Sequence, residues 1–292
     1  MSHTSSEASG KITAEVIRQR KGSDDRISCL TAYDYPTARI MDEAGIDLIL
    51  VGDSLANTVL GYEHTLPVTL DEMIHHAKAV RRGVKRALLV GDMPFGSYQA
   101  SIEQGVMSAV RFIKEAGVEA VKVEGGTKRV DLVRLLVESE IPVLGHIGLT
   151  PQSYLRMGGY KVQGKTIDAA QEVIEDAVAL QAAGVFAVVL EGIPCEIAKI
   201  ITDKLRIPTI GIGAGVDCDG QILVINDLIG LGFTKPAKFV REYINVKDLM
   251  TQAVKQYISD VVNGDYPNET ESYHSKDEIL AKLRKARMGR IA

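Results

Sequence analysis

The chain has 292 residues, of which 46% are apolar and 25% are charged, and its formal net charge is −4. This composition is typical of a globular protein with a large core, and a mildly acidic chain argues against nucleic-acid binding. No apolar run approaches the ~20 residues that a membrane span needs, and the polar start lacks the apolar segment of a secretory signal. Three widely spaced cysteines, Cys29, Cys195 and Cys218, indicate reduced thiols. We therefore expect a cytoplasmic protein that binds neither nucleic acid nor membranes.

Apolar, β-rich runs recur along the chain after a polar start, residues 1–10, which we expect to be a disordered arm. Near-continuous apolar runs suit the strands of a parallel sheet, because those strands are buried on both faces. An eighth run, 222–227, is weaker than the others. The seven clear runs are 27–34, 47–54, 87–94, 120–126, 142–149, 187–193 and 208–215.

Helices are predicted between these strands. The segment 69–82 opens with Thr-Leu-Asp-Glu, which is an N-terminal capping pattern. The segments 101–116 and 168–183 are each followed by a glycine, as helix C-caps often are. Strand and helix in repeated alternation indicate βαβ units and therefore a parallel α/β sheet.

The polar residues at the strand ends favour a closed barrel over an open sheet. A barrel collects functional groups at the C-terminal ends of all its strands, whereas a doubly wound sheet concentrates them at one switch point. No G-x-G-x-x-G follows the first strand. The sequence predicts a (β/α)8 TIM barrel as one domain over 11–266 with terminal helices, and a polar to basic extension over 267–292. The polar strand ends are Asp34, Asp53, Asp92, Glu124, His146 and Glu191.

Asp53, Asp92 and Glu124 predict a metal site. They end three neighbouring strands, and three carboxylates held together need a compensating cation. Oxygen ligands without cysteine point to Mg²⁺ rather than Zn²⁺, and magnesium keeps part of its shell open for substrate oxygens. Alternatively, Asp53 or Asp92 alone could cap the following helix, but capping does not explain Glu124.

Lys122, His146 and Glu191 are further candidate site residues. Lys122 shares a strand face with Glu124, and it could bind a substrate carboxylate or an enolate, form a Schiff base, or pair with Glu124. His146 is either a substrate donor or acid–base group, or a core histidine with satisfied hydrogen bonds. Glu191 follows an apolar run and suits a general base, with a salt-bridged or capping glutamate as the alternative.

Seven sequence blocks, taken in order, resemble the ketopantoate hydroxymethyltransferase family, and the resemblance runs from about residue 14 to 266. Agreement on one short block arises easily by chance, but agreement on seven in order does not. The blocks are V-G-D-S-L (51–55), T-L-P-V-T (65–69), D-M-P-F (92–95), V-K-V-E-G-G (121–126), G-H-I-G-L-T-P-Q-S (145–153), G-G-Y-K-V-Q-G (158–164) and I-G-I-G-A-G with D-G-Q-I-L-V (210–224).

The resemblance implies a phosphoenolpyruvate/pyruvate-type barrel and a pathway role. The family transfers a hydroxymethyl group from 5,10-methylenetetrahydrofolate to 3-methyl-2-oxobutanoate, and the product, 2-dehydropantoate, leads to pantothenate and coenzyme A. The implied cofactor is Mg²⁺, which stabilises an enolate. Family members are homo-oligomers, namely decamers, so the resemblance implies that assembly here too.

The resemblance also implies a role for each matching residue. Asp53 and Asp92 would bind the metal, with Glu124 as an outer metal partner. Ser54 and Lys122 would contact the substrate, beside Asp53 and Asp92. His146 is also expected to line the substrate site, because of its position at a strand end rather than because of the resemblance. Glu191 would accept the proton.

Two other functions remain open from the residues alone. One is a metal-dependent carbon–carbon lyase or mutase of the same superfamily acting on a 2-oxo acid, which would carry a reactive cysteine in a mobile loop. The other is a catalytically silent barrel that serves as a binding or assembly subunit. Loss of a site carboxylate would be its signature, and none is missing.

Overall fold

The computed structural model describes residues 10–288, so residues 1–9 of the predicted arm and the last four residues of the predicted extension lie outside the described residues. The chain divides into two compact units between Tyr243 and Ile244. The sequence, in contrast, groups everything up to residue 266 with the barrel. The first unit contains all the strands of the described residues and all the candidate site residues.

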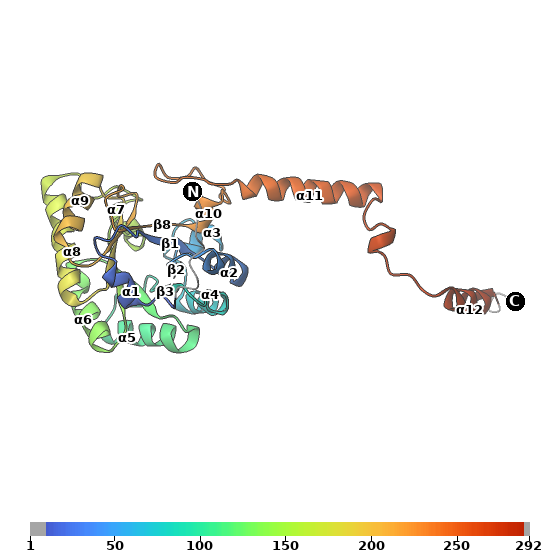
Figure 1. Ribbon diagram of the computed structural model, residues 1–292, viewed down its shortest axis with the longest axis horizontal. Helices are drawn as coiled ribbons and strands as arrows, with labels where there is room; N and C mark the ends of the chain where they lie inside the picture. Colours follow the sequence, from blue (N-terminus) through green and yellow to red (C-terminus); the bar gives the residue numbers. More distant parts are fainter. Residues whose placement is uncertain (1–9, 289–292) are drawn as a thin grey trace. The chain divides into compact units, whose positions relative to one another are not determined.

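The first unit is a closed barrel of eight parallel strands in sequence order (Figure 1). Each strand pairs with the next, and β8 pairs with β1. The predicted (β/α)8 barrel is therefore confirmed. The strands are β1 (Ile27–Thr31), β2 (Leu48–Val51), β3 (Leu88–Asp92), β4 (Ala120–Glu124), β5 (Val143–Gly148), β6 (Ala187–Glu191), β7 (Thr209–Ile212) and β8 (Gly220–Leu223).

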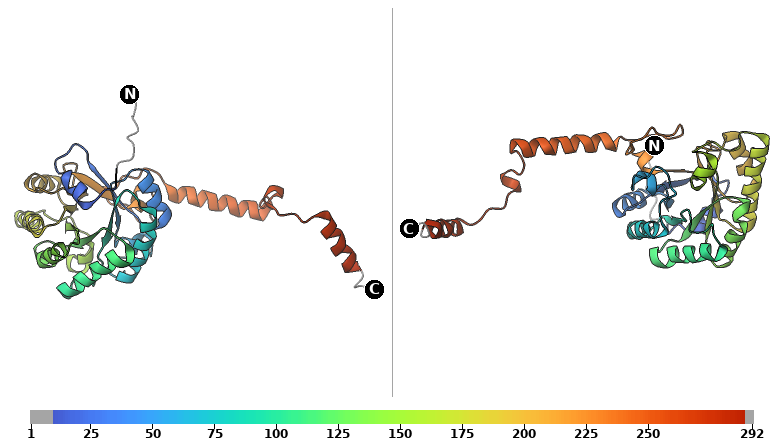
Figure 2. Two further views of the ribbon diagram at one scale, coloured as in Figure 1. Left: turned by 60° about the horizontal axis from the view of Figure 1, so that its bottom comes forward. Right: turned by 180° about the vertical axis from the view of Figure 1, so that it is seen from behind.

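Helices surround the strands, as both views in Figure 2 show. A π-helix (Phe112–Ala116) continues α5, and short 3-10 helices occupy Thr127–Arg129 and Pro151–Ser153. The α-helices of this unit are α1 (Ala14–Gln19), α2 (Tyr35–Glu43), α3 (Leu55–Thr58), α4 (Leu70–Gly83), α5 (Ile102–Arg111), α6 (Val130–Glu138), α7 (Tyr154–Met157), α8 (Ile167–Ala183), α9 (Cys195–Lys204) and α10 (Ile225–Leu228).

The predicted helix caps are present. Thr69 and Glu72 form a reciprocal capping box at the start of α4. Gly117 and Gly184 end their helices in the left-handed conformation, with φ of 68° and 99°.

The eighth strand differs from its predicted range of 222–227. Strand β8 starts at Gly220 and ends at Leu223, and Ile225 begins α10. Pairing of Gly220 with Ile27 sets the start, because a Cβ at Gly220 would lie 2.5 Å from the carbonyl oxygen of Ile27. The hydrogen bond from the Ile225 N–H to Thr31 Oγ1 turns the chain out of the sheet.

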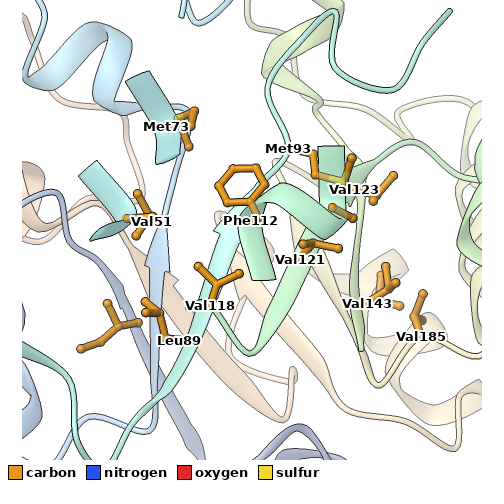
Figure 3. Close-up of a cluster of buried hydrophobic side chains, with 14 of the residues drawn as sticks. Val51, Met73, Leu89, Met93, Phe112, Val118, Val121, Val123, Val143 and Val185 are labelled. Carbon is orange, nitrogen blue, oxygen red and sulfur yellow. The ribbon is translucent and has the colours of Figure 1, made fainter. Parts of the chain in front are cut away.

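Alternation along the strands divides the core into two layers. In β2, Leu48 and Leu50 belong to an inner cluster within the barrel, whereas Ile49 and Val51 belong to an outer cluster beneath the helices. Figure 3 shows part of the outer cluster, where Phe112 lies among side chains that include Met73, Met93 and Val121. The inner cluster fills the barrel toward the N-terminal ends of the strands. Polar groups therefore concentrate at the C-terminal ends of the strands, which form the upper part of the barrel.

Asp219 braces the barrel at the start of β8. Its carboxylate accepts hydrogen bonds from the backbone N–H groups of Gly22 and Thr209 and from Lys21 Nζ, at 2.8 to 2.9 Å. Burial alone would raise the pKa of Asp219, but these hydrogen bonds and the charge of Lys21 bring it below the ordinary 3.8. A lowered acid pKa means that the folded state favours the carboxylate, which stabilises the fold.

We expect Asp219→Asn to lower the free energy of unfolding by about 1–3 kcal/mol at pH 7, since an amide cannot accept all these bonds. The stabilisation by Asp219 is fully present above pH 3.8 and is lost as the pH falls through the lower, folded-state pKa. The difference between D219N and the wild type in urea unfolding should therefore shrink below that pH. Asp217→Asn, at an exposed neighbouring site, is the matched control and should change little; equal effects of both variants would contradict the assignment.

The second unit contains α11 (Val246–Asn263) and α12 (Asp277–Met288). The predicted helix over 246–263 is confirmed, and none of its residues is buried. Within residues 10–288, no helix is both long enough and apolar enough to cross a membrane. Helix α11 leaves a set of apolar side chains exposed: Leu249, Met250, Val254, Tyr257, Ile258, Val261 and Val262.

Candidate active site

Four strands place their last polar side chains inside the upper barrel. Because alternate residues share a face, Lys122 and Glu124 of β4 point inward together with Ala120 of the inner cluster. The strand register places residues of neighbouring strands directly opposite one another: Asp92 of β3 pairs with Lys122, and Glu124 pairs with His146 of β5. Glu191 ends β6 on the same face as Val189 of the inner cluster. The four strand ends therefore meet at one cavity of about 100 Å³. Asp92, Lys122, Glu124, His146 and Glu191 all line it, as their positions at strand ends predict.

Lys122, Glu124, His146 and Glu191 form a continuous chain of contacts. Lys122 Nζ lies 3.5 Å from Glu124 Oε1 and 3.3 Å from His146 Nδ1. His146 Nδ1 lies 3.2 Å from Glu124 Oε1, and His146 Nε2 lies 3.1 Å from Glu191 Oε2. The imidazole thus bridges a buried carboxylate and the more accessible one of Glu191, whose side chain is 20% exposed. This geometry suits proton handling at Glu191.

Asp92 joins this chain to Asp53. Lys122 Nζ lies 2.8 Å from Asp92 Oδ1, and the Asp53 N–H donates to Asp92 Oδ2 at 3.0 Å. Asp53 follows the end of β2, and Ser54 next to it places its Oγ 2.8 Å from the hydroxyl of Tyr33. All four side chains of Asp53, Ser54, Asp92 and Lys122 line the cavity.

Negative charge is poorly compensated around Asp53 and Asp92 in the cavity. Burial, and then the charges of Asp92 and Glu124, raise the pKa of Asp53 well above its ordinary value. Burial also raises the pKa of Asp92, although Lys122 opposes the rise. Two carboxyl groups therefore lie side by side with too little positive charge to keep both ionised at no cost.

Around Glu124 and His146, positive and negative charges compensate one another. Burial alone would raise the pKa of Glu124, but Lys122 and His146 lower it below the ordinary value. Burial and Lys122 would lower the pKa of His146, but Glu124 and Glu191 raise it to about 9. His146 is therefore an imidazolium at neutral pH, between two carboxylates.

Gln152 and Tyr98 contact the site, although no sequence pattern predicts a role for either. Gln152 Nε2 donates to Asp53 Oδ2 at 3.0 Å and to the Met93 carbonyl at 2.9 Å, and its backbone N–H donates to Glu124 Oε2 at 3.1 Å. The Tyr98 hydroxyl donates to Gln152 Oε1 at 2.7 Å. Gln152 lies in the T-P-Q-S block, but nothing in its spacing reveals contact with Asp53, 99 residues away.

Asp34 does not join the site, contrary to the strand-end expectation. It is exposed, and it caps α2 by accepting a hydrogen bond from the Thr37 N–H at 2.8 Å. The three-carboxylate ligand set is also not formed: among residues 10–288, no three Asp, Glu, His or Cys side chains are arranged to hold a metal ion. Glu124 is instead held by Lys122, His146 and Gln152.

Comparison with known sequences identifies close relatives. A profile described as ketopantoate hydroxymethyltransferase matches residues 11–269. A 3-methyl-2-oxobutanoate hydroxymethyltransferase of Koribacter versatilis is 56% identical over 283 residues, covering 97% of this chain and 96% of that protein. The enzyme of the same name from Syntrophomonas wolfei is 52% identical, covering 94% of this chain and 99% of its own length.

Solved structures share the fold at much lower identity. A phosphoenolpyruvate phosphomutase from Streptomyces platensis is 14% identical with a TM-score of 0.57, covering 95% of this chain and 97% of its own. A 2,3-dimethylmalate lyase, described as a PEP mutase/isocitrate lyase superfamily member, is 16% identical with a TM-score of 0.54, covering 95% and 96%. These structures show the same barrel fold and nothing finer.

Proposed function

The chain belongs to the ketopantoate hydroxymethyltransferase family, and on that premise we propose how its barrel mouth transfers a hydroxymethyl group to 3-methyl-2-oxobutanoate. The proposed balance is that 3-methyl-2-oxobutanoate, 5,10-methylenetetrahydrofolate and water give 2-dehydropantoate and tetrahydrofolate. The chain of contacts from Glu191 through His146 to Lys122 carries this proposal, because it provides a base beside cations within one cavity. The product would enter pantothenate biosynthesis in the cytoplasm.

The residues of the cavity fit a bound Mg²⁺. Four carboxyl groups and two cationic side chains line it, so with every carboxyl group ionised the negative charges would exceed the positive ones by two. Asp53 and Asp92 offer only oxygen atoms, and their raised pKa values reflect a shortage of positive charge. Mg²⁺ is commonly bound by one or two carboxylates, which leaves positions for water and substrate. When bound there, the metal would orient the oxo acid and stabilise negative charge on its keto oxygen.

Glu191 would remove the proton from C3 of the oxo acid. Its carboxylate lies at the accessible end of the cavity, and the His146 imidazolium at 3.1 Å fixes its orientation. A bond then forms between C3 and the one-carbon unit, both bonds from that carbon to folate nitrogens break, and water supplies the hydroxyl oxygen. Lys122 and Ser54 would hold the substrate carboxylate; both line the cavity beside Asp53 and Asp92, which supports this role.

Deuterium exchange at C3 of 3-methyl-2-oxobutanoate, followed by proton NMR without folate, tests the proposal. We expect exchange with Mg²⁺ and none with a chelator, because enolisation needs both the base and the metal. Absence of exchange with folded protein, Mg²⁺ and added tetrahydrofolate would overturn it. Formation of 2-dehydropantoate on addition of 5,10-methylenetetrahydrofolate would then test the donor.

Gln152→Met should weaken Mg²⁺ binding by roughly 10–100-fold, the usual cost of losing an outer partner of a metal ligand. The variant retains the volume of the side chain but removes the hydrogen bond to Asp53 Oδ2. Isothermal titration with Mg²⁺ measures the affinity, and Gln99→Met is the matched control, because Gln99 touches Gln152 but not Asp53. Unchanged affinity in Q152M, with its Tm preserved, would show that Gln152 does not position the ligand.

A homo-oligomer is proposed as the working form, with the decamer of the family as the specific expectation. The exposed apolar side chains of α11, such as Val254, Tyr257 and Ile258, support it, because exposed apolar patches mark interaction surfaces. Sedimentation equilibrium of the full chain would measure the subunit number.

A further inference from the structure

A second and larger cavity, of about 380 Å³, opens beside the catalytic cavity; we name it the outer pocket. The loop after β3, the loop after β4, the segment after β5 and one face of α8 line it. Its volume falls in the usual range of small-molecule sites, whereas the catalytic cavity of about 100 Å³ suits only a small acid. The proposed reaction has one small and one large substrate, and the two cavities differ in the same way.

The outer pocket adjoins the catalytic cavity. Glu124 lines both spaces, and Gln152, which lines the outer pocket, donates to Asp53 of the catalytic cavity, so these two side chains form the partition between them. Gln152 faces both ways, because its Nε2 donates to Asp53 on one side and its Oε1 accepts from Tyr98, a residue of the outer pocket, on the other. Only one side chain therefore separates part of a ligand in the outer pocket from an oxo acid in the catalytic cavity.

Cationic side chains line the outer pocket, and two of them make no ion pair within residues 10–288. Lys128 and Arg156 line the pocket, and neither makes an ion pair with any residue between 10 and 288. Arg129 adds a third cation, with its guanidinium 5.3 Å from the centre of the Tyr98 ring. Such cations suit the carboxylates of a ligand.

A second set of charges is negative. Glu172 and Asp176, one turn apart on α8, also line the pocket. Asp176 accepts a hydrogen bond from the Thr127 N–H at 2.7 Å, and Glu172 makes no ion pair within the described part of the chain. No ion pair joins these carboxylates to Lys128 or Arg156, so both signs of charge are available to a ligand. Carboxylates suit the N–H donors of an amidine-like group.

We propose that the outer pocket binds the folate cosubstrate, an inference that rests on the proposed function. A folate has a flat pterin with an amidine-like donor edge, an aminobenzoyl ring and a glutamate tail. The pterin edge faces Glu172 and Asp176, the rings lie against the exposed Phe95, and the glutamate carboxylates face Lys128 and Arg156. The one-carbon unit, between the pterin and the aminobenzoyl group, then lies at the Glu124–Gln152 partition.

The double variant Lys128→Glu/Arg156→Glu tests the tail contacts. Equilibrium dialysis of tetrahydrofolate against the full chain, with Mg²⁺ and saturating 3-methyl-2-oxobutanoate, should show a Kd at least ~10-fold higher than in the wild type. Deuterium exchange at C3 without folate should be unchanged, since neither residue lines the catalytic cavity. The control Arg82→Glu/Lys114→Glu makes the same charge change at exposed positions away from the pocket and should leave the Kd unchanged.

Two fragments test the orientation. Glu172→Gln should weaken inhibition of product formation by 6-methyltetrahydropterin but not by p-aminobenzoylglutamate, and K128E/R156E should do the reverse. If K128E/R156E binds tetrahydrofolate as tightly as the wild type, the outer pocket is not the folate site. Failure of the wild type itself to exchange C3 or to bind tetrahydrofolate would instead refute the proposed function, so the two failures are distinguishable.

Discussion

Glu191→Gln is expected to slow deuterium exchange at C3 of 3-methyl-2-oxobutanoate by about 10²–10⁴-fold, the usual contribution of a general base. The amide retains the size of the side chain but cannot accept a proton. Glu191 Oε2 lies 3.1 Å from His146 Nε2, and a glutamine can turn its carbonyl oxygen toward that N–H, so the cavity should keep its shape. Binding of the oxo acid should therefore survive while its deprotonation is lost.

The matched control is Glu196→Gln. Glu196 lies five residues further along the chain, is exposed on α9 and does not line the catalytic cavity, so its replacement should leave the exchange rate unchanged. An exchange rate in E191Q within about threefold of the wild type would remove Glu191 from the role of base. Glu124, which contacts Nδ1 of His146 on the other side of the imidazole ring, would then be the next candidate for the base.

The residues that could be predicted are those that follow strand periodicity. Alternation and parallel register together place Asp92, Lys122, Glu124, His146 and Glu191 on the inner face, and the structure brings all five to one cavity. These rules are local, because each strand presents alternate residues inward whatever its neighbours are. The sequence carries that information in full.

Residues beyond the strand ends obey no such rule. Asp53 and Asp34 both follow a strand, yet Asp53 is buried in the site and Asp34 is an exposed helix cap. The chain turns at each strand end, so the direction of these side chains depends on the loop and its contacts. Gln152 is harder still, because its partner Asp53 is distant in sequence and only the folded loop brings them together.

Substitution at the two proposed metal ligands is expected to abolish Mg²⁺ binding in both cases but to change the stability of the metal-free protein in opposite directions. The loss of affinity should exceed the ~10–100-fold cost of removing an outer partner. Asp53→Asn removes a buried charge that Asp92 and Glu124 disfavour. Its amide oxygen can still accept from Gln152 Nε2, so the variant should be more stable without metal than the wild type.

Asp92→Asn should be less stable, because both oxygens of Asp92 face donors. Lys122 Nζ lies 2.8 Å from one, and the Asp53 N–H donates to the other, so an amide would turn an N–H toward one of these donors. That mismatch costs about 1–3 kcal/mol, and each kcal/mol corresponds to roughly 2–4 °C in Tm for a unit of this size. Thermal unfolding with chelator, repeated with Mg²⁺, measures both effects.

The wild type should gain Tm with Mg²⁺ by mass action, and neither variant should. A Tm gain in D53N equal to that of the wild type would show that the metal binds elsewhere. Equal destabilisation of both variants without metal would show that Asp53 is held by contacts rather than strained by charge. The expected pattern, with opposite signs before metal and a common loss of response after it, follows only if the barrel maintains an excess of negative charge at this point for a divalent cation to neutralise.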